Sequence, residues 1–582
     1  MSKTSTLKIA LAQLNPTVGD IERNALKVIE ARAEAARLGA DLVVFPELFV
    51  TGYPPEDLVL KPAFQQAVKA RVLALARELG DGPAVLLGTI WPENGSLYNA
   101  VALIERGEVT ALRFKVDLPN YGPFDEKRVF TAGPLPGPIS FKGVRIGVPI
   151  CEDIWKDEVT ECLDECGAEM LLVPNGSPFD WKKVDVRLNV AVARVTETGL
   201  PLGYVNQVGG QDELVFDGGS FVLDADRSLR VQLPQWREAI VLTEWSRDED
   251  GDWSCAIGER ARASEGSAAA YQACMLGLRD YVDKNGFPGV VLGLSGGIDS
   301  ALVAALAVDA LGPKRVHAVM LPYRYTSAES LTDAAACAKA LGIRYDVVPI
   351  AAPVEGFTSA LGDMFKGLAS DITEENLQSR ARGTILMAIS NKLGSMVVTT
   401  GNKSEMSVGY ATLYGDMNGG FNPVKDLYKT EVYRIARWRN AHLPEGAKGP
   451  KGEVIPENII TRAPSAELRD NQTDQDSLPP YDALDDILSC LVENEMSLSE
   501  IIARGHAPEI VQKVERLLYI SEYKRRQAAP GVKITSRSFG RDRRYPITNR
   551  FREKLSPESV EAASAKAPSG ITAPRADGGE AF

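Results

Sequence analysis

Short apolar runs alternate with longer helical patterns through the first half of the chain. Residues 7–14 alternate partly between apolar and polar positions, as a strand does, and residues 21–38 carry an Ala/Glu/Arg-rich helical pattern that ends at Gly39. Apolar runs of strand length follow at 41–47, 84–90, 100–104, 144–150, 170–173 and 202–207. This alternation of strands and helices predicts a layered α/β fold.

The second half repeats the alternation in a form typical of a parallel sheet. A helix is predicted at 271–285, and a helix with one polar and one apolar face is predicted to begin at Asn376. Strands are predicted at 290–294, 316–321, 345–350 and 397–400. Helical sequence precedes several of these strands, which predicts a doubly wound parallel sheet with its ligands at the carboxyl ends of the strands.

Two segments interrupt the periodic pattern and suggest domain boundaries. Residues 243–268 are charged and lack apolar periodicity, so we expect an interdomain linker between a domain at 1–242 and a second at 269–552. Residues 553–582 are rich in Ala, Pro, Ser and Gly, which predicts a disordered tail.

Composition narrows the class of protein. The 582 residues are 45% hydrophobic and 25% charged, as in ordinary globular domains, and the net charge of −13 argues against a nucleic-acid partner. We expect a cytoplasmic protein without a membrane partner, because no apolar run approaches the ~20 residues of a membrane span and the start lacks a signal-peptide pattern. The seven cysteines include no C-x-x-C pair, so neither a disulfide framework nor a zinc site is expected.

The turn Ser295-Gly-Gly-Ile-Asp-Ser300 follows an apolar strand and opens an Ala/Leu-rich helix. This order directs unpaired backbone N–H groups and the positive end of a helix dipole toward one point, which makes an anion site. The loop has no lysine and ends in Asp-Ser, so it suits a pyrophosphate held with a metal on a carboxylate. The alternative is a strand–turn–helix corner that binds nothing.

Three residues at strand ends of the first half have the chemistry of covalent acyl transfer. Glu47 is a candidate base, Lys115 a candidate oxyanion partner that also lowers the thiol pKa, and Cys151 a candidate nucleophile. Taken singly, each is equally a surface carboxylate, a surface lysine or a small buried thiol. All three histidines lie in the second half, which argues against a Cys–His glutaminase centred on Cys151.

The Glu–Lys–Cys set with its flanking sequence resembles the nitrilase, or carbon–nitrogen hydrolase, superfamily, and the loop at 295–300 resembles the N-type ATP pyrophosphatases. Five further segments resemble NAD synthetase motifs: residues 375–382, 400–405, 415–421, 464–468 and 522–527. Together they resemble the glutamine-dependent NAD+ synthetase family. The resemblance implies a nitrilase-like α-β-β-α sandwich followed by a doubly wound parallel-sheet ATP pyrophosphatase domain.

The resemblance also implies roles for individual residues. The glutaminase residues are Glu47, Lys115 and Cys151, and the glutamine-binding residues are Tyr121, Glu152, Ser177 and Lys183. The alternative for these last four is a tyrosine of the core and three polar residues of the surface. The ATP-binding residues are Gly293, Leu294, Ser295, Gly296, Gly297, Ile298, Asp299, Ser300, Thr400 and Lys425. The residues for deamido-NAD+ are Asn376, Glu405 and Lys524, and Asp299 and Glu405 are expected to hold Mg²⁺.

The implied reaction amidates deamido-NAD+ with nitrogen from glutamine and releases glutamate, AMP and pyrophosphate. We also expect ammonia to pass between the two sites and Mg²⁺ to accompany ATP, without a prosthetic group. The resemblance implies in addition that the chain forms a homo-oligomer. One alternative is another amidating or thiolating pyrophosphatase, such as a GMP synthetase or a tRNA thiolase. A second is a free-standing amidase whose C-terminal half only senses nucleotide.

Overall fold

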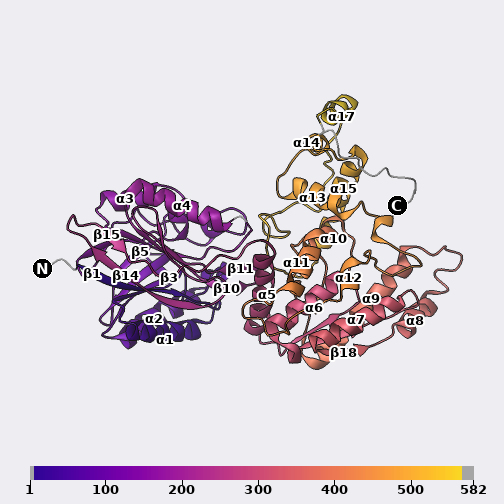
Figure 1. The fold of residues 1–582 in the computed structure, drawn as a ribbon, viewed down its shortest axis with the longest axis horizontal. Coiled ribbons are helices and arrows are strands. Elements are labelled where there is room, and N and C mark those ends of the chain that lie inside the picture. The colour runs from indigo at the N-terminus through magenta and orange to yellow at the C-terminus, as the bar shows by residue number, and fades with distance from the viewer. Residues whose placement is uncertain (1–4, 182, 567–582) are drawn as a thin grey trace. The chain divides into compact units, whose positions relative to one another are not determined.

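The computed structural model describes residues 5–181 and 183–566. Its contacts divide the chain into two compact units, Met1–Lys284 and Asn285–Phe582 (Figure 1). Each unit has its own sheets and its own hydrophobic core. Among the described residues, no helix combines the length and the apolar character that crossing a bilayer requires.

The first unit is a sandwich of two sheets. The seven-stranded sheet has the order β15 (Trp253–Cys255), β14 (Ala239–Arg247), β1 (Thr6–Gln13), β2 (Leu42–Val44), β3 (Ala84–Glu93), β4 (Ser96–Glu105) and β5 (Glu108–Phe114). The six-stranded sheet has the order β13 (Leu229–Gln232), β12 (Phe221–Leu223), β9 (Leu202–Asn206), β8 (Met170–Asn175), β7 (Val144–Gly147) and β6 (Ile139–Phe141).

Two pairs of helices cover the outer faces of this sandwich. Helices α1 (Ile21–Arg37) and α2 (Pro62–Leu79) pack on the seven-stranded sheet, and α3 (Glu158–Glu165) and α4 (Lys183–Thr198) pack on the other (Figure 1). The expected α-β-β-α arrangement is confirmed. The central strands β2, β8 and β9 are buried on both faces, which is why their sequences are continuous apolar runs.

Residues of β1 show how the two faces are used. Ile9 and Leu11 belong to the core between the sheets, whereas Ala10 and Ala12 belong to the core under α1, together with Val28. Leucine and isoleucine therefore fill the space between the sheets, and alanine allows the helix to approach the other face closely.

The segment expected to be a linker is instead part of the seven-stranded sheet. Strand β14 pairs antiparallel with β1 from Thr6↔Ser246 to Gln13↔Ala239, and β15 pairs with β14. Trp245 and Trp253 are buried, whereas Glu244 faces solvent. The charged residues that hid this strand pair are the solvent-facing Glu244 and the turn at residues 248–252 between β14 and β15. Residues 256–265, which are irregular, then lead to α5 (Gly266–Lys284).

Helix α5 packs against the hairpin of β10 (Val208–Gln211) and β11 (Leu214–Asp217). Asp280 of α5 accepts the Gly210 N–H at 2.7 Å and the Asn15 side-chain N–H at 2.7 Å. The predicted helix is confirmed, but these contacts group it with the first unit.

The second unit contains a four-stranded, all-parallel sheet, as predicted. Its order is β18 (Arg344–Val347), β17 (Val316–Met320), β16 (Val290–Gly293) and β19 (Met396–Val397). The helices between these strands are α6 (Ile298–Leu311), α7 (Ala328–Leu341), α8 (Ala351–Leu361) and α9 (Ile372–Leu393). The strand order reverses between β16 and β19, which is where ligands bind in open α/β sheets.

A helical cluster follows the sheet in the second unit. Its elements are α10 (Lys403–Val408), α11 (Lys429–Ala441), α12 (Glu457–Thr461), α13 (Tyr481–Val492), α14 (Leu498–Ala503), α15 (Pro508–Ile520), α16 (Glu522–Arg525) and α17 (Pro557–Ser564). Leu484, Ile501 and Val514 are at its core. The tail predicted at 553–582 is helical in its first part, where Ala563 of α17 is buried in this core; residues 567–582 lie outside the described part.

A buried ion pair joins α6 to α11. Both nitrogens of the Arg439 fork contact Asp309, with Nε–Oδ2 at 2.5 Å and Nη2–Oδ1 at 3.0 Å. We expect Asp309→Ala to lower the free energy of unfolding by about 3–5 kcal/mol, because it leaves a guanidinium buried without its partner. Urea unfolding of the full-length chain measures this loss.

Glu244→Gln is the matched control for this prediction. It removes an exposed ion pair with Lys8 at 2.9 Å, and exposed pairs contribute about 0–1 kcal/mol. Equal losses in the two variants would contradict a stabilising role for the buried pair.

Candidate active sites

Strand ends bring the three candidate glutaminase residues together in the first unit. Glu47 lies three residues beyond β2, Lys115 directly follows β5, and Cys151 begins the 3-10 turn η3 (Cys151–Ile154) after β7. Glu47 and Lys115 have no exposure to solvent, and Cys151 is 6% exposed. Lys115 Nζ donates to Glu47 Oε1 at 2.7 Å. The structure thus places the predicted base, cation and thiol in one buried cluster.

The charge of Lys115 is balanced by a second carboxylate that sequence reasoning missed. Glu126 Oε1 and Oε2 both lie 3.0 Å from Lys115 Nζ, and the Tyr53 hydroxyl donates to Oε1 at 2.8 Å. Burial lowers the pKa of Lys115, but Glu126 and Glu47 outweigh that effect and raise it well above its ordinary value. Lys115 is therefore a permanent cation. Glu126 gave no signal in the sequence, because it lies in an irregular, polar segment.

Both oxygens of Glu47 have hydrogen-bond donors. Asn99 of β4 donates its side-chain N–H to Oε1 at 2.7 Å, alongside Lys115. The Gly176 N–H donates to Oε2 at 2.9 Å and also faces the sulfur of Cys151. Oε1 is thus saturated by two donors, and Oε2 is the oxygen on the side of the thiol.

The thiol of Cys151 is protonated in the resting site. Burial raises its pKa well above the ordinary value, and the Glu47 carboxylate adds to the rise. Lys115 acts in the opposite direction and lowers the thiol pKa, as expected, but burial and Glu47 outweigh it. Because only the thiolate attacks, this site needs a base beside the sulfur, and Glu47 occupies that position.

The residues expected to bind glutamine lie around this cluster. The Tyr121 hydroxyl donates to Glu152 at 2.9 Å, and burial raises the pKa of Glu152, which adjoins Cys151 in sequence. The Lys183 ammonium lies over the rings of Phe124 and Trp155, 5.0 and 5.8 Å from their centroids. Ser177 is buried, and its N–H donates to Asn206 Oδ1 at 2.9 Å.

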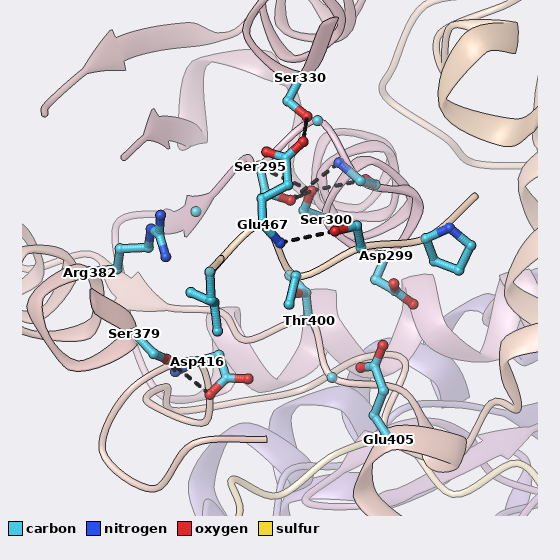
Figure 2. A pocket seen from close by; sticks show the side chains of 18 of the residues that line it. Ser295, Asp299, Ser300, Ser330, Ser379, Arg382, Thr400, Glu405, Asp416 and Glu467 are labelled. Atoms are coloured by element: carbon cyan, nitrogen blue, oxygen red, sulfur yellow. Dashed lines mark hydrogen bonds between the residues drawn. The ribbon is translucent and has the colours of Figure 1, made fainter. Parts of the chain in front are cut away.

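A cavity of about 760 Å³ lies at the switch point of the second unit's sheet. All eight residues of the predicted loop, 293–300, line it, together with Thr400 and Glu405 (Figure 2). The loop is closed by Ser300 Oγ, which accepts the Ser295 N–H at 3.2 Å and donates to Gly297 O at 3.0 Å. Helix α6 begins at Ile298, so the free N–H groups of its first turn open into the cavity.

A lysine between two carboxylates is the main charged feature of this cavity. Lys429 Nζ lies 2.5 Å from Asp299 Oδ2 and 3.1 Å from Glu405 Oε1. Burial lowers the pKa of Lys429, but Asp299 and Glu405 outweigh it and raise the pKa. The Asn402 side chain holds the other oxygen of Asp299 at 2.8 Å. Asp299 and Glu405 thus converge on the Lys429 ammonium.

Lys429 was missed because it lies in the first turn of a polar helix, α11, where a surface lysine is the ordinary interpretation. Glu467 lies within a segment noted for its resemblance, 464–468, but it had no predicted role. Its carboxylate accepts from Ser327 Oγ and Ser330 Oγ at 2.7 Å each, so it joins that segment to the start of α7 (Figure 2).

Three predicted ligand residues do not line the cavity. Lys425 Nζ donates to the carbonyl of Ala529 at 2.7 Å, and Lys524 Nζ donates to the carbonyls of Gly409 and Ala411 at 2.8 Å. Asn376 Oδ1 accepts the Thr412 hydroxyl at 3.0 Å. Lys524 and Asn376 therefore support the 409–412 loop, of which Tyr410, Ala411 and Thr412 line the cavity.

Comparison with known proteins assigns a family to each half of the chain. The carbon-nitrogen hydrolase family matches residues 8–254, and the NAD synthase family matches residues 270–528. The chain is 52% identical over 551 residues to the glutamine-dependent NAD(+) synthetase of Rhodobacter capsulatus, which covers 95% of this chain and 100% of that one. The corresponding Thermotoga maritima protein is 43% identical over 584 residues, covering 94% and 100%.

Solved structures show the same relationship. The structure of glutamine-dependent NAD+ synthetase from Acinetobacter baumannii in complex with ADP is 44% identical, with a TM-score of 0.74, and covers 94% of this chain and 99% of that one. The glutamine-dependent NAD(+) synthetase structure from Cytophaga hutchinsonii has a TM-score of 0.78 at 23% identity, over 96% and 100% of the two chains, and supports the fold.

The fold, the two sites and these matches define an amidating ligase that joins a carbon–nitrogen hydrolase domain to an NAD synthase domain. The chain belongs to the glutamine-dependent NAD+ synthetase family.

Gly296 allows the loop at 293–300 to pass close to α7. Its φ is +82°, and a Cβ there would lie 2.4 Å from the Ser330 carbonyl oxygen. We expect Gly296→Ala to lower the free energy of unfolding by at least about 1–3 kcal/mol, because backbone strain adds to the overlap with backbone atoms. Urea unfolding of the full-length chain measures the loss.

Gly297→Ala is the matched comparison. Gly297 has an extended backbone with φ −91°, and its added Cβ would meet only the Ser295 hydroxyl, at 3.3 Å. A smaller loss is expected there. A loss at Gly297 as large as that at Gly296 would contradict the steric explanation.

Proposed function

We propose that Cys151 releases ammonia from glutamine and that the cavity of the second unit uses this ammonia to amidate ATP-activated deamido-NAD+. The observation that carries the proposal is that one chain holds both a buried Glu–Lys–Cys cluster and a cavity, lined by the loop at 293–300, at the switch point of a parallel sheet. Covalent amide cleavage and ATP-dependent carboxylate activation are the two halves of such a transfer.

In the first site, Glu47 takes the thiol proton as the Cys151 sulfur attacks the side-chain carbonyl carbon of glutamine. Lys115 stabilises the oxyanion of the tetrahedral intermediate. The C–N bond then breaks, the Glu47 proton goes to the leaving nitrogen, and ammonia departs from a thioester. Glu47 next deprotonates a water molecule, which hydrolyses the thioester to glutamate and restores the thiol.

Recognition of glutamine is assigned to the polar groups around this cluster. Glu152 and Lys183 supply opposite charges suited to the ammonium and carboxylate of an amino acid. Tyr121 would orient Glu152 through its hydrogen bond. Ser177 follows Gly176, whose N–H contacts Glu47, and it would therefore lie near the side-chain amide of glutamine.

In the second site, the nicotinate carboxylate of deamido-NAD+ attacks the α-phosphorus of ATP and displaces pyrophosphate. The N–H groups at the start of α6 and the Lys429 ammonium would face the negative charge of that leaving group. Ammonia then attacks the acyl carbon of the adenylate, AMP leaves, and a proton is lost to give the amide of NAD+. Adenylation is needed because a carboxylate is a poor electrophile.

The donor set of this site fits Mg²⁺. Asp299 and Glu405 contribute only oxygen atoms, and both contact the Lys429 ammonium, so they converge on a position that a cation already occupies. Mg²⁺ prefers carboxylate and phosphate oxygens. Asp299 and Glu405 would hold the ion, which would offset charge on the pyrophosphate.

Substitution of the two sites separates the proposed half-reactions. We expect Cys151→Ala to abolish glutamine-dependent NAD+ formation and to retain ammonia-dependent formation, because only the nitrogen source is lost. Asp299→Ala should abolish both routes, because ATP activation is common to them. NAD+ formation with each nitrogen donor and the yield of AMP are measured. A folded Cys151→Ala protein that lost both activities would contradict the two-site assignment.

The route of nitrogen is tested by isotope competition. Ammonia free in water at neutral pH is mostly ammonium, which is not nucleophilic, so we expect nitrogen to pass to the second site without mixing with bulk ammonium. Amide-¹⁵N glutamine with excess unlabelled ammonium should give mainly ¹⁵N-labelled NAD+, measured by mass spectrometry.

Cys151→Ala in the same mixture is the control for this experiment and should give unlabelled NAD+ only. If the NAD+ made by the unmodified protein carried ¹⁵N diluted in proportion to the bulk ammonium, direct passage would be contradicted.

A further inference from the structure

Asp153 is a buried carboxylate that contacts the chain on both sides of the glutaminase cluster. It lies in η3, two residues after Cys151, and is 1% exposed. Oδ1 accepts the N–H groups of Val116 at 3.0 Å and Asp117 at 2.7 Å. Oδ2 accepts the N–H of Ile150 at 2.9 Å. One side chain therefore binds the backbone directly after Lys115 and directly before Cys151.

These two backbone segments belong to different sheets. Lys115 follows β5 of the seven-stranded sheet, whereas Cys151 follows β7 of the six-stranded sheet, so no strand ladder joins them. Lys156 also contacts Asp117, but the Lys156 side chain is 64% exposed, and exposed pairs hold geometry weakly. The Asp153 carboxylate is the buried polar link between the two segments.

The backbone at Cys151 requires such support. Its φ is +47°, in the left-handed region that residues with a side chain rarely adopt. A conformation of this kind persists only where the surrounding contacts impose it. The Ile150 N–H held by Asp153 is one of those contacts, and the Asp153 N–H in turn donates to the Ile150 carbonyl at 3.1 Å.

We propose that Asp153 is a positioning residue of the glutaminase, which sets the Lys115 ammonium relative to the Cys151 sulfur by fixing both backbones. This inference rests on the proposed assignment of Glu47, Lys115 and Cys151. The hydrogen bonds of the Asp153 carboxylate go to backbone N–H groups, so Asp153 acts through the two backbones. Stabilisation of an oxyanion depends on donor placement within fractions of an ångström, so loosening either backbone lowers the rate of thioester formation.

Asparagine at position 153 tests the link with little change of volume. Its amide oxygen can accept N–H groups on one side only, and its NH₂ group then faces an N–H on the other side. Asp153→Asn therefore breaks one of the two contacts, and Asp153→Ala breaks both.

The experiment compares kinetics and thiol reactivity in the full-length protein. We expect Asp153→Asn to lower kcat for glutamine hydrolysis by about 10²-fold, as a misplacement of about 1 Å does, with a smaller change in KM. Alkylation of Cys151 by iodoacetamide, followed by peptide mass spectrometry, should shift to higher pH, because a displaced Lys115 favours the thiolate less. Ammonia-dependent NAD+ formation should stay within about twofold of the unmodified protein, since each half-reaction has its own site.

Asp224→Asn is the matched control. Asp224 is a buried carboxylate of the same unit that accepts the Ser254 hydroxyl at 2.8 Å and pairs with Arg230 at 2.5 Å, apart from the cluster. It should leave glutamine hydrolysis and the alkylation profile unchanged, even where it lowers the melting temperature.

Three results would overturn assignments, each in a different way. If both Asp153 variants keep the kcat and the alkylation profile of the unmodified protein while Cys151→Ala is inactive on glutamine, only the role of Asp153 is refuted. Equal losses of glutamine- and ammonia-dependent activity in Asp153→Asn would also refute it, because the residue would then support folding only. Retained glutamine hydrolysis in Cys151→Ala would refute the glutaminase assignment itself.

Discussion

A buried ammonium group held between two carboxylates governs the geometry of each active site. In the first unit Lys115 lies between Glu47 and Glu126, and in the second Lys429 lies between Asp299 and Glu405. An isolated charge is too costly to bury, so each lysine requires its partners. The carboxylates in turn require the lysine, because burial raises the pKa of Glu126 and of Glu405. Removal of either lysine would leave two carboxylates buried without their cation.

The two arrangements serve different chemistry because different groups lie beside them. In the first unit the Cys151 thiol lies beside Glu47, and burial together with this carboxylate raises the thiol pKa. In the second unit the neighbouring groups are backbone N–H groups at the start of α6, which suit an anion. The same arrangement of charges thus lies beside a buried thiol in one site and beside a helix N-terminus in the other.

Strand ends place both sets of residues. Glu47, Lys115 and Cys151 follow three strands, and the loop at 293–300 and Thr400 follow β16 and β19 at the switch point. The sandwich separates Lys115 and Cys151 onto different sheets, and the buried side chain of Asp153 connects their backbones. Precise placement in the first unit therefore depends on side-chain to backbone hydrogen bonds more than on strand pairing.

The sequence alone determined the fold class, the α/β alternation, the Glu–Lys–Cys set and the phosphate loop. Local sequence patterns predict these features. Apolar runs indicate buried strands, and a Ser-Gly-Gly turn before an Ala/Leu-rich helix leaves backbone N–H groups unpaired. Most of the long apolar elements were predicted within a few residues. The linker prediction at 243–268 was wrong for residues 243–255, because Trp245 and Trp253 are buried in paired strands that are separated by a charged turn.

Only the tertiary structure decided which polar residues complete the sites. Glu126, Asn99 and Lys429 lie on segments where a surface side chain is the ordinary interpretation, and their partners are many positions away in the chain. Lys425, Asn376 and Lys524 lie in or near motifs, yet they contact backbone or side-chain oxygens behind the cavity wall. Local patterns record burial and turns, whereas the pairing of a buried charge depends on distances that exist only after the strands and helices have packed.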